Sequence, residues 1–389
     1  MVLAIVAAGC TSSSGSSSSF QPAPHPSYAG GLVPDGGGPV LPSMRLVTVS
    51  FAGYEHEADV QAFGSWLPTS DWLTTAGAEY GVGAGVDAGH VVLADTAPTT
   101  VTLPEVGAFL AARIGDGTLP SSTSIESDYL YVLYYPSSTT VHITAGDAGC
   151  SAAGGFHASY SNGGLYFVFA AIPDNCTTIA PGLGLGSLDF VEMDASHEII
   201  EGASDPYTVA TDGSAVAGGP SAWHMTDETN PWWSLGGEIG DACTSHCVHD
   251  SGFTVQRIWS NRAASQGAEP CLPAVDPEFG VSPTADAPIT VAAGQSAQVP
   301  LVGWSTTPIA SWKGVATSGP YVTSDFEPMV VTQPELFGNG TPGTLTVTVP
   351  AGTPSGSHGV VFIEAVPASS PGGVAYGSWG IWPVIVDVP

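Results

Sequence analysis

Two continuous runs of apolar and aromatic residues constrain the fold of this chain most. They read YLYVLYY at 129–135 and LYFVFAAI at 165–172. Short runs of this kind are typical of strands that lie buried inside a sheet. The segment MRLVTVSFAGY, from Met44, alternates and is rich in β-branched residues, and FTVQRIW at 253–259 has a similar composition. The sequence therefore predicts a sheet that includes these strands.

Helix signals lie between these strands. Ser70 can cap a helix that runs through 71–73, and the box Thr102-Leu-Pro-Glu105 opens another that ends near Gly115. Gly186 to Asp205 is predicted to form one longer helix, because Pro206 follows its end. Residues 44–274 are therefore predicted to form an α/β domain with a mixed sheet.

The composition changes after this region. Residues 277–389 contain short β-branched runs separated by Gly and Pro turns, with no helix signal. Strands spaced in this way predict a β-sandwich. The phrases VAAGQSAQVPL and VPAGTPSGSHGVVF resemble bacterial immunoglobulin-like modules, which implies a spacer or binding appendage without chemistry of its own. The expected fold class is thus α+β followed by an all-β immunoglobulin-like sandwich.

The charge balance excludes several functions. Five basic residues stand against 35 acidic ones, which gives a net charge of −30. So few cations cannot form a nucleic-acid-binding surface or a polybasic membrane anchor. Ten Trp, twelve Tyr and thirteen Phe are too many for a wholly disordered chain. The large net charge also favours a monomer.

The first residues predict export. MVLAIVAAGC is too short to span a bilayer, and its end resembles a bacterial lipobox with Cys10 as the lipidated residue. No Lys or Arg precedes this run, so 1–10 is interpreted as the remnant of a lipoprotein signal, or alternatively as a buried strand. Residues 11–43 read as a Ser/Gly/Pro-rich tether. The expected location is extracytoplasmic, either periplasmic or at the cell surface, with membrane contact only through the lipid.

The remaining cysteines suggest disulfides, as expected of an exported protein. Cys150 and Cys176 flank one strand signal and are predicted to pair. Cys271 is predicted to pair with Cys243 or Cys247. The alternative is a metal site built from Cys243, Cys247 and the nearby His246 and His249.

The string Ser196-His197-Glu198-Ile-Ile-Glu201 carries the strongest chemical signal. On a helix, His197, Glu201 and Asp205 would share one face, with Glu198 beside His197. This is the layout of a zincin helix, H-E-x-x-H, with Glu201 in place of the second histidine. Zinc accepts imidazole nitrogen and carboxylate oxygen, and Glu198 could act as the general base.

An acidic loop, Gly236-Gly-Glu238-Ile-Gly-Asp241, could supply a further ligand through Glu238 or Asp241. Clustered carboxylates repel one another unless something positive lies between them, and no Arg or Lys is near in sequence. A metal ion, zinc or alternatively calcium, is the natural candidate. The competing interpretation is a solvated acidic face with a locally packed His197.

Three segments resemble the bacterial branch of the EXORDIUM-like, phosphate-induced protein family. They are SHEIIEGASDPYT, WWSLGGEIGDAC and FTVQRIWSN with a closing PC, and 149–176 fits the same pattern. The resemblance implies an exported domain with a zincin-like H-E-x-x-E helix. It makes His197, Glu201 and Glu238 the expected ligands, with Asp205 and Asp241 as alternates and Glu198 as the base.

Other residues of that region are open to two interpretations. His157 could face the same cleft in a catalytic role or be a simple loop histidine. Trp223, Trp232 and Trp233 could form a substrate wall or pin their loop to the core.

Two functions therefore remain from the sequence. The first is a lipid-anchored, zinc-dependent peptidase whose cleft lies between the 187–205 helix and a sheet edge. The second is a non-catalytic surface protein that binds cell wall or polysaccharide and whose acidic cluster is structural or holds calcium.

Overall fold

The structure is a computed structural model. It describes residues 20–28, 32–121, 128–142, 154–162, 165–175, 185–206, 221–227, 230, 232–233, 237–244, 246–275, 278–285, 287–318, 325–326, 328–368 and 381–389. Cys10, Cys150 and Cys176 lie outside the described residues, so the lipidation site and the predicted Cys150–Cys176 bridge stay predictions. No helix within these ranges is long and apolar enough to span a membrane.

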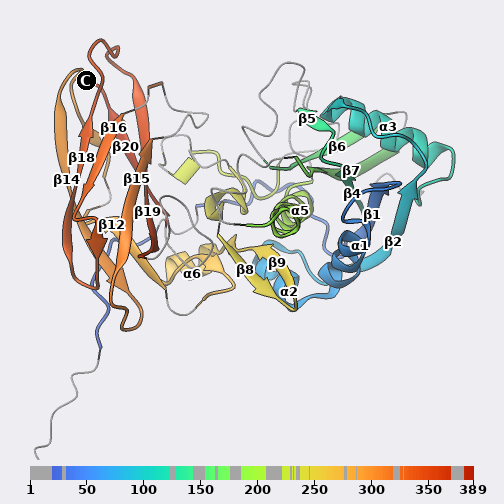
Figure 1. Cartoon of the computed structure of the whole chain (residues 1–389), viewed down its shortest axis with the longest axis horizontal. Coiled ribbons are helices and arrows are strands. Elements are labelled where there is room, and N and C mark those ends of the chain that lie inside the picture. The colour runs from blue at the N-terminus through green and yellow to red at the C-terminus, as the bar shows by residue number, and fades with distance from the viewer. Residues whose placement is uncertain are drawn as a thin grey trace, which may run out of the picture.

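A five-stranded mixed sheet organises the first part of the chain (Figure 1). Its strands, in spatial order, are β2 (Val86–Leu93), β1 (Arg45–Phe51), β4 (Tyr129–Tyr135), β7 (Leu165–Pro173) and β6 (Phe156–Asn162). The first four run parallel, and β6 pairs antiparallel with β7 at the edge. The strands predicted at 129–135, at 165–172 and after Met44 are confirmed.

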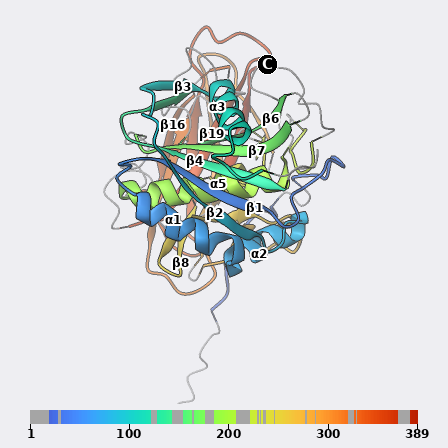
Figure 2. The same cartoon turned by 90° about the vertical axis from the view of Figure 1, so that its right-hand side faces the viewer.

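The two apolar runs are continuous because both faces of the sheet are covered. In β4, Tyr131 and Leu133 face one apolar layer, whereas Leu130 and Val132 face the other. Helix α3 (Leu103–Gly115) covers the first face, and α1 (Glu57–Trp66) and α5 (Ser187–Ser204) cover the second (Figure 2). The predicted mixture of helix and sheet is thus confirmed.

Local capping explains where two helices begin. Ser70 Oγ accepts a hydrogen bond from Leu73 N at the start of α2 (Asp71–Gly77). Glu105 Oε2 accepts from the backbone N–H of Thr102 at 2.8 Å and from its hydroxyl at 2.9 Å. Both predicted caps are confirmed. The sequence could show them because each joins residues only three apart.

Smaller elements surround the main sheet. They are η1 (Leu67–Thr69), η2 (Ala78–Tyr80), the pair β3 (Thr100–Thr102) and β5 (Thr140–His142), η5 (Asp241–Cys243), the pair β8 (Cys247–Asp250) and β9 (Phe253–Gln256), α6 (Asn261–Ser265), and the pair β10 (Ile258–Trp259) and β11 (Cys271–Leu272). The strand predicted over 253–259 is interrupted at Arg257. The Arg257 side chain is buried and donates to the carbonyls of Pro273 and Cys271.

The last part of the described chain contains strands and no helix, as predicted. One sheet has the order β12 (Phe279–Pro283), β14 (Ser296–Ser305), β18 (Pro342–Thr348) and β16 (Met329–Gln333). The other has the order β13 (Ile289–Thr290), β20 (Ile381–Asp387), β19 (His358–Pro367), β15 (Trp312–Ser318) and β17 (Leu336–Phe337).

These two sheets pack against each other, as in a sandwich (Figure 1). The indole of Trp312, on β15, is fully buried and donates to the carbonyl of Gly280, on β12. Its ring also packs against Phe279, with 5.3 Å between the ring centroids. The coarse prediction of a β-rich C-terminal sandwich therefore agrees with the structure.

The prediction of a tether over 11–43 is wrong for the described residues 20–28 and 32–43. Tyr28 is buried, donates to Glu269 at 2.9 Å and packs against Trp232 and Trp382. Leu32, Val33 and Leu41 are buried as well. These few apolar side chains bury enough surface to order a segment whose composition is otherwise that of a linker.

Candidate metal centre

Helix α5 carries His197, Glu198 and Glu201 of the candidate site and is nearly all buried beneath the sheet. It ends at Ser204, and the backbone of Asp205 is no longer helical, with φ −139° and ψ 68°, because the residue before a proline is disfavoured in the helical conformation. His197, Glu198 and Glu201 lie on the helix as predicted. Asp205 lies just beyond it, so the predicted helical spacing of Asp205 from Glu201 does not hold.

The turn at 237–241 brings a second set of carboxylates to α5. Glu201 Oε1 accepts hydrogen bonds from Gly240 N and Asp241 N, each at 3.0 Å. A Cβ on residue 240 would lie 2.6 Å from Glu201 Oε1 and 2.9 Å from His197 Nδ1, so only glycine allows this close approach. Gln256 secures the turn by donating from Nε2 to the carbonyl of Gly240.

His197, Glu201 and Asp241 form the first group of potential ligands, called the His197 group. The Nε2 atom of His197 lies 3.0 Å from Glu201 Oε2 and 3.8 Å from Asp241 Oδ1. Zinc ligands at about 2.1 Å in a tetrahedron are roughly 3.4 Å apart, which lies between these two distances. The Asp241 side chain is 25% exposed, so the group is open to solvent on one side.

His157 joins the site from the edge strand β6. Its Nδ1 lies 2.9 Å from Glu198 Oε2 and 3.6 Å from Glu201 Oε2, and its Nε2 lies 3.5 Å from Glu238 Oε1. His157, Glu198 and Glu201 form the second potential metal-binding group, the His157 group. Of the two interpretations of His157, the one that places it at the site agrees with the structure.

Asp205, His224 and Glu238 form a third group, called the His224 group. Asp205 Oδ1 accepts from Ala222 N at 2.8 Å, and Asp205 Oδ2 lies 3.9 Å from His224 Nδ1. The structure therefore places Glu238 and Asp205 with His224, and Asp241 rather than Glu238 beside His197 and Glu201. Together the three groups are called the carboxylate–histidine cluster.

Two further residues of this region were not among the predicted site residues. Asp194 is buried and lies one helical turn before Glu198, a spacing that could have indicated it. His224 has no such signal, because a loop places it. That loop is fixed by a backbone bridge between Asp35 and Trp223 and by a hydrogen bond from Met225 N to the carbonyl of Gly237.

The electrostatics of the cluster depend on its own residues. Burial disfavours a charged imidazole, but the surrounding carboxylates outweigh it and raise the pKa of His157 and His197 well above the usual range. The described Arg residues that form ion pairs do so elsewhere, Arg113 with Asp95 and Asp116 and Arg257 with Glu269 and Glu278. Protonated histidines, or a cation in their place, therefore balance the acids.

The acids respond to the same burial in two ways. Burial raises the pKa of Glu238 to about 8 and that of Asp241 to about 7. Burial also opposes the ionised form of Glu201, yet His197, His157 and the Asp241 N–H together lower the Glu201 pKa. Glu201, which belongs to both the His197 group and the His157 group, therefore favours a negative charge more than Glu238 and Asp241 do.

One disulfide fixes the neighbourhood of the 237–241 turn. Cys243 is bonded to Cys271, which confirms one of the two predicted partners of Cys271. Cys247 is a buried free thiol, and burial raises its pKa to about 12. The alternative metal site is wrong, because the Cys243 sulfur is oxidised and His249 instead lies 3.0 Å from Thr254 Oγ1.

The aromatic loop residues are attached to the core. Trp232 is 2% exposed and packs against Tyr28, Trp259 and Trp382. Trp223 packs edge-on against Tyr80. Of the two interpretations of these residues, pinning of the loop agrees with the structure for Trp223 and Trp232.

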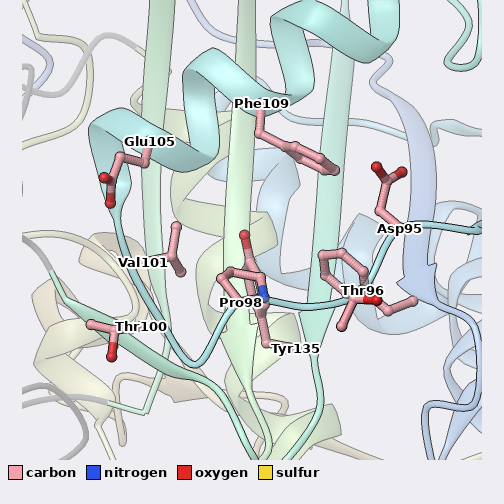
Figure 3. Close-up of a pocket in the computed structure, with 9 residues that line it drawn as sticks. Asp95, Thr96, Pro98, Thr100, Val101, Glu105, Phe109 and Tyr135 are labelled. Atoms are coloured by element: carbon pink, nitrogen blue, oxygen red, sulfur yellow. The ribbon is translucent and has the colours of Figure 1, made fainter.

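A cavity of about 370 Å³ lies at the opposite face of the sheet (Figure 3). Phe51, Phe109 and Tyr135 form its apolar walls, and Asp95 and Glu105 also line it. These walls belong to the layer under α3, whereas the carboxylate–histidine cluster lies on the α5 side. This cavity is therefore separate from the candidate metal centre.

Comparisons with known proteins give no relative for this chain. No protein family and no curated protein matches it. The solved structures it matches include the Escherichia coli chaperone DraB (10% identity, TM-score 0.20, covering 29% of this chain and 54% of that one) and the surface layer protein SbsC, domains 1–6 (15%, 0.20, 29% and 14%).

A third match is the CsuC–CsuE chaperone–tip adhesion subunit pre-assembly complex of Acinetobacter baumannii, at 13% identity and TM-score 0.18, covering 28% of this chain and 56% of that one. This chain covers 54%, 14% and 56% of the length of these three structures. At such low TM-scores these matches carry no information about its function.

Proposed function

We propose that this chain is an exported metal-dependent hydrolase that cleaves peptides, with zinc held by His197, Glu201 and Asp241. The observation that carries the proposal is the convergence of His197 Nε2, Glu201 Oε2 and Asp241 Oδ1 from a helix and a separate turn. One imidazole and two carboxylates form a donor set that zinc accepts. The proposal includes two predictions from the sequence, namely a relationship to the EXORDIUM-like family and a lipid anchor at Cys10.

A zinc ion held by His197, Glu201 and Asp241 would supply Lewis-acid polarisation of a substrate carbonyl. The protein supplies the proton transfer. Glu198 Oε1 lies 4.0 Å from His197 Nε2, so the Glu198 carboxylate stands beside the proposed ligands without belonging to the His197 group. In this position Glu198 takes a proton from the attacking water and later returns it to the leaving amine.

His157 positions Glu198 for this role. The His157 ring is 6% exposed and holds Glu198 Oε2 at 2.9 Å, which leaves Oε1 directed toward His197. Gly155 makes room for Glu198, since a Cβ there would lie 2.9 Å from Glu198 Cγ. The general base is therefore held from two sides, by α5 and by the edge strand β6.

The test compares hydrolysis and metal content in the same variants. Glu198→Gln is expected to keep its zinc and to lose about 10²- to 10⁴-fold in hydrolysis of a mixed peptide library, read by mass spectrometry. Glu335→Gln, at an exposed carboxyl in the bend between β16 and β17, is the matched control and should change neither. Equal hydrolysis by the wild type and Glu198→Gln would contradict the proposal.

A second candidate is a non-catalytic surface protein in which the cluster holds calcium and the C-terminal sandwich binds cell-wall polysaccharide. The many carboxylates of the cluster favour it, since calcium prefers oxygen ligands. It predicts calcium rather than zinc in the purified protein, and retention of insoluble cell wall by the full chain without cleavage of peptides.

A further inference from the structure

The His224 group has a feature that the His197 group does not share. Each of its three residues has one buried side-chain atom that lacks a hydrogen-bond partner among the described residues. These atoms are Asp205 Oδ2, His224 Nδ1 and Glu238 Oε1. Asp205 is fully buried, and Glu238 is only 9% exposed. A buried carboxylate oxygen without a partner costs free energy unless a cation or a proton satisfies it.

The surrounding chain holds these atoms in place. Asp205 is fixed by the hydrogen bond from Ala222 N to its Oδ1, which leaves Oδ2 directed at His224. The His224 ring lies against Gly237, where a Cβ would come within 2.6 Å of His224 Cε1. Glu238 follows Gly237 directly, so one short segment positions both the imidazole and the second carboxylate.

We infer that Asp205, His224 and Glu238 form a second divalent-cation site, distinct from the His197 group. One imidazole nitrogen and two carboxylate oxygens, all within 4.8 Å of one another, suit zinc or another transition-metal ion. His224 is 37% exposed, which gives an ion a path from solvent. This site does not depend on the hydrolase proposal.

His157 connects the two sites. Its Nδ1 faces Glu198 and Glu201, whereas its Nε2, itself buried and without a hydrogen-bond partner, faces Glu238 Oε1 at 3.5 Å. One imidazole therefore lies between the ligands of the His197 group and those of the His224 group.

In the experiment, the metal-free full-length chain is titrated with Zn²⁺, and isothermal titration calorimetry measures how many equivalents bind. The wild type is expected to bind two equivalents, and Asp205→Asn and His224→Ala one each. Asp205→Asn keeps an oxygen for the Ala222 N–H and removes only the charge, so it preserves the local fold. His358→Ala, at an exposed histidine paired with Asp387, is the control and should still bind two equivalents.

His197→Ala separates this inference from the proposed function. Retention of one equivalent in His197→Ala, lost only when Asp205→Asn is added, would support the second site. The same Zn²⁺ stoichiometry in Asp205→Asn, His224→Ala and the wild type would overturn it, whatever His197→Ala shows. Complete loss of binding in both Asp205→Asn and His197→Ala, with unchanged circular dichroism spectra, would also overturn it, because the cluster would then hold a single shared ion.

Discussion

His157 Nδ1 lies 2.9 Å from Glu198 Oε2, although the two residues are 41 positions apart in sequence. One stands on the edge strand β6 and the other in the middle of helix α5, so the contact forms only when the helix packs beneath the sheet. It joins the histidine of Gly-Phe-His to the glutamate of the H-E-x-x-E string. The remainder of the carboxylate–histidine cluster extends from this pair.

We expect His157→Gln to destabilise the metal-free protein by about 3–5 kcal/mol at pH 7.5, because buried carboxylates lose the imidazolium that compensates them. Saturating zinc should restore part of this loss. Urea unfolding followed by tryptophan fluorescence, with and without zinc, measures both effects. A free energy of unfolding equal to that of the wild type would contradict the proposed compensation.

We expect Gly240→Ala to weaken zinc binding roughly tenfold or more, because its Cβ would displace Glu201 Oε1 and His197 Nδ1. Gly115→Ala is the matched control, since nothing lies within 4 Å of the position of its Cβ. Competition with a fluorescent zinc chelator measures the affinity of each variant. Equal affinities for the two variants would show that the 237–241 turn does not shape the site.

Replacing Cys243 and Cys271 together by alanine should lower the free energy of unfolding by about 2–4 kcal/mol, because the bridge closes a loop with a sequence separation of 28. Zinc affinity should fall as well, since Asp241 begins the short helix η5 that contains Cys243. Urea denaturation and zinc competition give the two values. An unchanged zinc affinity in the double variant would mean that the bridge stabilises the fold alone.

Glu364 makes stability depend on pH in a region far from the cluster. It is buried on β19, its Oε2 has no hydrogen-bond partner among the described residues, and burial raises its pKa from 4.5 to about 7. Between these values the unfolded carboxyl ionises while the folded one stays neutral. The folded state therefore loses stability as the pH rises from 4.5 to 7, by on the order of 3 kcal/mol.

Glu364→Gln should remove this loss. The variant is expected to match the wild type near pH 4.5 and to exceed it in stability at pH 8, whereas Glu335→Gln should follow the wild type throughout. Urea unfolding at the two pH values is the measurement. If the difference in free energy of unfolding between Glu364→Gln and the wild type does not grow with pH, burial of Glu364 is not the cause of the pH dependence.

Local patterns allowed much of the fold to be predicted. The alternation of Leu130 and Tyr131 between two apolar layers gives the continuous apolar run of β4, and the Thr102–Glu105 box marks the start of α3. Both signals act over a few residues, so the sequence displays them directly. The packed segment 32–43 was not predicted, because its order depends on contacts with distant residues.

The candidate site, too, could be predicted from the sequence only in part. The helical spacing of His197 and Glu201 predicted that their side chains lie together, and the structure places His197 Nε2 3.0 Å from Glu201 Oε2. Spacing could not indicate His224, which reaches the cluster through the backbone bridge between Asp35 and Trp223. Nor could it show that Asp205 lies beyond the helix and faces His224 rather than His197.

Binding of zinc at His197 is tested by the metal content of the purified full-length chain, measured by elemental mass spectrometry beside His197→Ala and His358→Ala. We expect the wild type and His358→Ala to carry equal zinc and His197→Ala to carry one equivalent less. Equal zinc in all three proteins, or no zinc in the wild type after refolding with Zn²⁺, would contradict it.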